Sequence, residues 1–139
     1  MEIRSIESFL PYYGNIRART RKLVQLIPGG QVEWRPAAGR FSLGDLARHI
    51  AAVERYVFAE NVQGRPSRYP GCGPELGATP EAILDFMDRA HAETVGVFAS
   101  LTAEQLSEKG LTPDGSRVTL WKLLRALVEH EVHHRGQIY

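Results

Sequence analysis

The segment that decides the fold lies at the end of the chain, where residues 119–139 read TLWKLLRALVEHEVHHRGQIY. Its apolar residues recur at the three- and four-residue spacing of an amphipathic helix. An apolar stripe of this kind has to be buried against another element. The segment therefore predicts a long helix that begins near Thr119 and packs against other helices. With an advance of about 100° per residue, the stripe consists of Leu120, Leu124, Leu127 and Ile138.

Three earlier segments have the same periodicity. The first runs from about Ser5 to Ile27 and is ended by Pro28-Gly29-Gly30, because proline cannot continue the helical hydrogen bonds. The second begins at Ser42, with Asp45 three residues later in the position of a capping box. The third begins at Thr79-Pro80-Glu81, where a capping residue precedes proline at the first helical position.

The segments that connect these helices contain almost no pattern typical of β-strands. A long loop rich in glycine and proline spans Gly64–Gly77, and Thr102–Gln105 predicts a short capped helix. Pro113-Asp114-Gly115 predicts a turn, and only Gln31–Trp34 is a candidate for a short extended piece. We therefore predict an all-α four-helix bundle, with residues 1–139 as one domain and the long loop between its second and third helices.

Composition excludes several classes of protein. The 139 residues carry 17 Lys+Arg against 16 Asp+Glu, so nothing calls for nucleic acid or an anionic membrane as a partner. No apolar run approaches the roughly 20 residues of a membrane span, and the start lacks the apolar core of a secretory signal. A single cysteine, Cys72, cannot form an intrachain disulfide. We expect a cytoplasmic protein.

Histidines on the last helix carry the chemistry. His130 and His134 are four residues apart, so their imidazoles can share one metal ion. Both fall on one flank of the apolar stripe, whereas His133 faces largely away. A catalytic site usually has three protein ligands. His49, on the flank of the second helix, is a better third ligand than His91 on the third.

Other residues have two interpretations. Glu131 falls in the apolar stripe, where an unpaired carboxylate is costly. It is expected to bind a ligand histidine or Arg135, or else to act as a catalytic general base, the first being favoured. Trp34 is expected in the core. A solvated face is expected for Arg17, Arg19, Arg21 and Lys22.

Two other interpretations of these histidines stay open. His130-Glu131-Val132-His133-His134 also fits the H-E-x-x-H pattern of zinc proteases. Only five residues follow it, however, and no strand is predicted that could align a peptide. The histidine pair could also simply line a helix flank and bind carboxylates such as Glu129.

Two motifs together resemble a known family. The stretch Gln31–Tyr56, which contains Trp34-Arg35-Pro36, Phe41-Ser42 and His49, forms one half of the signature, and residues 130–137 (HEVHHRGQ) form the other. The chain resembles the DinB-like (damage-inducible) family of four-helix proteins, which includes the YfiT-type metal-dependent hydrolases. The resemblance implies that His49, His130 and His134 bind a divalent ion, with zinc and nickel both suited to three nitrogens.

The resemblance also implies a homodimer and a small-molecule substrate. Relatives include transferases and isomerases that use bacillithiol, mycothiol or glutathione. We therefore expect a thiol-dependent transferase or a hydrolase, with a low-molecular-weight thiol as a second cofactor. A stress-response protein that binds a metal or ligand without turnover is the alternative, because a fold does not fix its chemistry. The family's last helix usually continues further than Tyr139.

Overall fold

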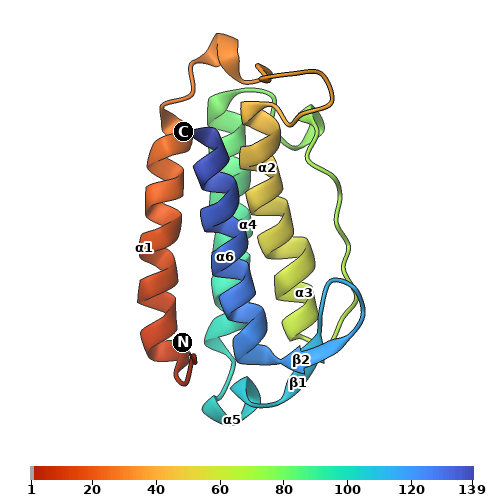
Figure 1. Cartoon of the computed structure of the whole chain (residues 1–139). Helices are drawn as coiled ribbons and strands as arrows, with labels where there is room; N and C mark the ends of the chain where they lie inside the picture. The colour runs from red at the N-terminus through yellow and green to blue at the C-terminus, as the bar shows by residue number, and fades with distance from the viewer. Residues whose placement is uncertain (1) are drawn as a thin grey trace.

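The computed structural model describes residues 2–139 and contains four long helices side by side (Figure 1). They are α1 (Ile6–Gln25), α2 (Leu43–Val53), α4 (Pro80–Ala99) and α6 (Leu120–Ile138). The predicted all-α four-helix bundle is confirmed. No helix within residues 2–139 is both long and apolar enough to cross a membrane.

The second long helix is interrupted by one wide turn. After α2 the chain forms a π-helical turn, η2 (Glu54–Phe58), and then the last turn of the helix, α3 (Ala59–Val62). A π turn accommodates one extra residue, so it rotates the side chains that follow it about the helix axis. Glu54, the first residue of this turn, is fully buried.

Side-chain caps set the helix boundaries where the sequence predicts them. Ser42 and Asp45 form a reciprocal capping box at the start of α2. Thr79 caps α4 ahead of Pro80, and Thr102 caps the short helix α5 (Ala103–Leu106). Each cap satisfies backbone N–H groups that the helix itself leaves free.

The long loop returns the chain to the end of the bundle where α2 starts. Residues 64–79, which include a short 3-10 turn η3 (Pro74–Leu76), run back along the outside of α2 and α3 (Figure 1). Helix α4 therefore starts at the same end of the bundle as α2. The connection from α1 to α2, with its 3-10 turn η1 (Gly29–Gln31), covers this end, and the last turn of α6 reaches it as well.

A small antiparallel hairpin was not predicted. Strands β1 (Lys109–Leu111) and β2 (Arg117–Thr119) pair across the turn that Pro113-Asp114-Gly115 does predict. Gly115 has φ +90, a conformation that glycine adopts readily. The extended piece expected at residues 31–34 is wrong, because this stretch lies in η1 and the turn after it. Strands of three residues are too short to show alternation in a sequence.

Apolar side chains from the four helices fill the interior in two clusters, one around Phe9 and Leu124 and the other around Ile50 and Met87. Trp34 belongs to neither: it lies on the α1–α2 connection with 52% of its surface exposed, so its expected core position is wrong.

Ionisable and aromatic side chains from all four long helices meet in the middle of the bundle. We call them the buried polar cluster: Tyr13, Arg17, Glu54, His91 and Glu131. Arg17 donates to Glu131 from Nε (3.0 Å) and Nη2 (3.1 Å) and also pairs with Glu54. The Tyr13 hydroxyl donates to Glu54, and His91 Nδ1 lies 3.1 Å from the same carboxylate. The solvated position expected for Arg17 is therefore wrong.

The charged groups of the cluster stabilise one another in their ionised forms. Burial opposes ionisation of Glu54, yet the Arg17 guanidinium keeps the pKa of Glu54 below its usual value. Burial likewise opposes the charge on Arg17, but Glu54 raises the pKa of Arg17. Burial and Glu54 raise the pKa of Tyr13 well above its usual range, so its hydroxyl stays protonated and donates. The cluster therefore holds one cation between two carboxylates.

Removing the cation should destabilise the fold strongly. In Arg17→Met two buried carboxylates lose their partner, and breaking a buried pair in this way typically costs about 3–5 kcal/mol. Urea unfolding monitored by circular dichroism would measure the loss. Arg19→Met, at an exposed position of the same helix, should change the free energy of unfolding by less than about 0.5 kcal/mol. Equal stability of the two variants would contradict the role assigned to Arg17.

Candidate metal centre

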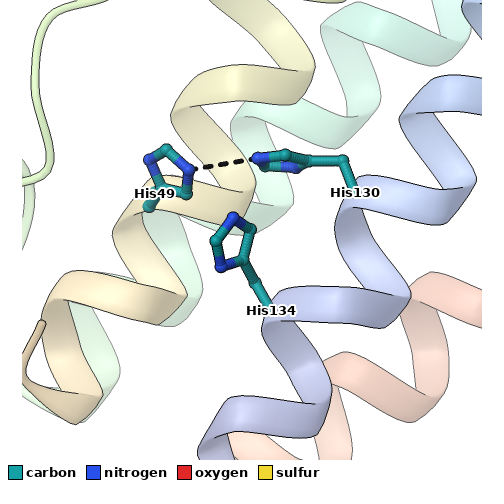
Figure 2. A group of neighbouring side chains, drawn as sticks. All are labelled: His49, His130 and His134. Atoms are coloured by element: carbon teal, nitrogen blue, oxygen red, sulfur yellow. Dashed lines mark hydrogen bonds between the residues drawn. The ribbon is translucent and has the colours of Figure 1, made fainter.

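Helices α2 and α6 bring three histidines together near the end of the bundle where α2 starts (Figure 2). His49 comes from α2, and His130 and His134 come from successive turns of α6. One ring nitrogen of each lies within 4.8 Å of the other two. The three imidazoles thus point into one space, where they can hold a metal ion.

The ring positions follow from helix geometry. His130 and His134 are one turn apart on the same flank of α6, and their ring centroids are 4.5 Å apart. Helix α2 presents His49 from the opposite side, with its ring centroid 4.9 Å from His130 and 4.6 Å from His134. The Nε2 atoms of His49 and His130 are 3.1 Å apart.

Neighbouring side chains fix which nitrogen of two of the rings faces the centre. The Tyr69 hydroxyl lies 2.6 Å from His49 Nδ1, and the Gln137 side-chain oxygen lies 2.6 Å from His134 Nδ1. A carboxamide oxygen can only accept a hydrogen bond, so His134 Nδ1 carries the proton. This leaves the Nε2 lone pair of His134 for the centre. In the same way, a proton on His49 Nδ1 donated to Tyr69 would free the Nε2 lone pair of His49.

The environment keeps the imidazoles neutral. Burial, and after it the neighbouring His134, lowers the pKa of His49 to about 4. Burial, His134 and His49 lower the pKa of His130 to about 3. Burial also lowers the pKa of His134. At pH 7 the three rings are therefore uncharged, which is the form that binds a metal.

The donor set fits a divalent ion. Two nitrogens that share a zinc ion at about 2.0–2.1 Å lie roughly 3 Å apart, and the two Nε2 atoms of His49 and His130 already have this separation. Hydrogen bonds to the second ring nitrogen, of the kind made here by Tyr69 and Gln137, are the usual support of metal-binding histidines. Three neutral nitrogens also leave a further coordination position for solvent or substrate.

Arg48 attaches the surrounding loops to α2. Its guanidinium is fully buried and donates to the backbone oxygens of Cys72 and Gly77, each at 2.7 Å. It also pairs with Glu33 of the α1–α2 connection at 2.9 Å. Because Arg48 precedes His49, these bonds hold both loops beside the histidine, which brings Tyr69 within reach of its ring.

Other residues singled out in the sequence lie outside the triad. Glu131 turns toward α1, where Arg17 and Thr20 donate to it, and neither a ligand histidine nor Arg135 bonds to it within residues 2–139. His133 is exposed, and His91 faces the buried polar cluster. Burial raises the pKa of the Cys72 thiol, although a hydrogen bond with Tyr69 opposes this.

Four residues of the site were not identified from the sequence as parts of it: Tyr69, Gln137, Phe41 and Arg48. Phe41 contacts two of the histidines, with ring centroids 5.4 Å from His49 and 6.4 Å from His134. Gln137 follows His134 by three residues, so helical spacing could have indicated it. Tyr69 lies in a loop, where no periodicity points to a partner.

Comparison with known proteins places this chain in a family. The model of the DinB superfamily matches residues 13–138. YjoA, an uncharacterized protein of Bacillus subtilis (strain 168), is 31% identical in an alignment of 124 residues that covers 86% of this chain and 77% of YjoA.

Solved structures share the fold. A DinB-like protein from Bacillus cereus ATCC 10987 superposes with a TM-score of 0.81 at 21% identity, covering 97% of this chain and 89% of that one. The crystal structure of YjoA gives a TM-score of 0.72 at 24% identity, with 94% and 86% covered. The mycothiol-dependent maleylpyruvate isomerase gives 0.73 at 14% identity, covering 96% of this chain but only 60% of the isomerase.

The triad predicts which histidine a metal requires. Purified protein should contain close to one divalent ion per chain, and His134→Ala should lose it because only two nitrogens remain. His133→Ala is the matched control, since its ring is exposed on the same helix turn, and should retain the ion. Elemental analysis by mass spectrometry measures both. Equal loss in the two variants would show that the triad does not select the ligands.

The contact between Tyr69 and His49 predicts a loss of metal affinity without the hydroxyl. Removal of such a supporting hydrogen bond typically costs 10–100-fold in affinity, and we expect about ten-fold for Tyr69→Phe. Competition with a chromogenic chelator measures it, and Tyr12→Phe, at an exposed site on α1, should leave the affinity unchanged. An unchanged affinity in Tyr69→Phe would mean that the hydroxyl does not orient His49.

Proposed function

The chain belongs to the DinB superfamily, and from that premise we propose that it is a metal-dependent enzyme that acts on a small molecule. The observation that carries the proposal is the convergence of three ring nitrogens, one from each of His49, His130 and His134, within 4.8 Å of one another. Their neutral state, and the hydrogen bonds made by the outer nitrogens of His49 and His134, are what a bound divalent ion needs.

Thiol-dependent group transfer is the reaction we place first. A divalent ion held here would lower the pKa of a thiol, or of water, and so supply a nucleophile at neutral pH. The fold shared with a mycothiol-dependent isomerase supports the thiol. Hydrolysis, with water as the nucleophile, is the second candidate, and zinc and nickel both suit three imidazole nitrogens.

The protein's own residues hold the reactants. Tyr69 and Gln137 bind the Nδ1 atoms of His49 and His134, so the Nε2 atoms of both rings face inward, and the Gln137 oxygen also keeps the proton of His134 on Nδ1. Phe41 packs against His49 and His134 and forms an apolar wall on that side of the triad. Glu131, the catalytic candidate from the sequence, is proposed as a positioning residue: its bonds to α1 fix the rotation of α6, and with it the direction of His130.

A binding protein without turnover is the second candidate function. The observation that favours it is that, within residues 2–139, no carboxylate is hydrogen-bonded to a triad histidine, whose partners are Tyr69, Gln137 and one another. Glu54 and Glu131, the two carboxylates of the buried polar cluster, are both paired with Arg17. The same pairing argues against a zinc protease, in which the glutamate of the H-E-x-x-H pattern must act beside the ion.

A thiol screen on metal-loaded protein tests the proposal. An electrophilic acceptor such as 1-chloro-2,4-dinitrobenzene would be mixed with glutathione, bacillithiol or mycothiol, beside ester and amide substrates without any thiol. We expect turnover with one thiol only, falling to background in His49→Ala and unchanged in His133→Ala. Chloride release and absorbance of the conjugate give the rate.

Each other result reassigns the protein. Ester or amide cleavage without thiol would make it a hydrolase. No turnover with any substrate, together with one tightly bound ion per chain, would support the binding protein instead. Turnover that survives in His49→Ala would remove the triad from the reaction altogether.

A further inference from the structure

An open pocket of about 580 Å³ lies beside the triad, between the α1–α2 connection and the last turn of α6. Its volume falls within the usual range for small-molecule sites, about 300–1,000 Å³. Two of its lining residues contact the candidate ligands: Phe41 packs against His49 and His134, and Gln137 binds His134 Nδ1. Phe41 is therefore a wall shared by the pocket and the triad.

The side chains that line the pocket carry charge of one sign. Arg40 and Tyr139 are the only lining residues with an ionisable side chain, and no Asp or Glu side chain lines the pocket. Arg40 forms no ion pair with any residue from 2 to 139, whereas its neighbour Arg35 lies 3.7 Å from Asp45. Gln137 uses its side-chain oxygen on His134, so its NH₂ group is left to donate. An anionic group on a ligand would meet an unpaired cation and an amide donor.

The rest of the lining is apolar and partly aromatic. Leu43 and Leu46 contribute from the first turns of α2, and Trp34 and Phe41 contribute rings. These rings are 52% and 44% exposed, although large aromatic side chains are usually well buried. Two exposed rings in one pocket offer a surface on which a flat, conjugated body can stack.

We propose that this pocket binds a small carboxylic acid with a flat apolar body, its carboxylate at Arg40 and its body between Trp34 and Phe41. Because Phe41 packs against His49 and His134, a body that stacks on Phe41 lies beside the triad. The assignment of this acid as a reactant rests on the proposed function, but its binding does not, because none of the binding groups is a metal ligand.

Fluorescence of Trp34 reports on the pocket directly. The chain has two tryptophans, so a Trp121→Phe background leaves Trp34 as the single reporter. EDTA-treated protein would be titrated with cinnamate, with cinnamamide as its uncharged isostere, and with acetate as a carboxylate without a body. We expect cinnamate to bind at least ten-fold more tightly than cinnamamide and acetate not to bind measurably.

Two variants test separately the contributions of charge and of stacking to the binding of cinnamate. Arg40→Gln should weaken cinnamate about ten-fold and leave cinnamamide unchanged, whereas Phe41→Ala should weaken both. Arg19→Gln, an exposed arginine of α1 without an ion pair among residues 2–139, is the matched control and should change neither. Equal binding of acid and amide, or an Arg40→Gln variant that binds cinnamate normally, would overturn the inference.

The two proposals can fail separately. Selective binding of cinnamate without turnover in any thiol or hydrolysis assay would remove the proposed function and keep the pocket. Turnover with no carboxylate preference would do the reverse. Protection of Trp34 from acrylamide that grows with protein concentration would place a second copy of the chain on this surface, and that result would also overturn the inference.

Discussion

The buried guanidinium of Arg17 links the helices of the bundle through the carboxylates that it binds. Arg17 of α1 lies between Glu54, at the start of the π turn, and Glu131 of α6, while His91 of α4 bonds to the same Glu54 carboxylate. Apolar helix faces can slide past one another by a turn at modest cost, but a buried ion pair has one arrangement of low free energy. Since His130 directly precedes Glu131, this arrangement also sets the rotation of α6 that turns His130 toward α2.

The sequence predicts the parts that depend on local rules. Ser42, Thr79 and Thr102 cap helices because a side-chain oxygen next to free N–H groups needs no information from the rest of the chain. The separation of His134 from His133 follows from the helical repeat alone, and the structure places His134, but not His133, beside His49.

What the sequence could not predict depends on distant partners. Arg17 follows Tyr13 by one turn on the buried face of α1, but an arginine on an apolar stripe has a low free energy only if carboxylates from other helices reach it. Tyr69 likewise reaches His49 through a loop that is held by tertiary bonds, among them those of Arg48 to Cys72 and Gly77 and that of the Arg68 N–H to the Tyr56 backbone oxygen. A single π turn has no characteristic residue spacing by which the sequence could reveal it. Each of these features belongs to tertiary structure.

Two parts of the molecule, the helices and the loops at one end of the bundle, contribute the residues of the candidate site. Ring positions come from the helices, which the buried polar cluster holds rigidly, so the nitrogens can stay at metal-binding separation before any ion arrives. Tyr69, Phe41 and Trp34 come instead from the two loops at this end of the bundle, and loops tolerate changes that helices packed in a core do not. A change at Trp34 or Arg40 can therefore alter what binds beside the triad without moving His49, His130 or His134. The residues that line the pocket are thus separate from the residues that can hold a metal ion.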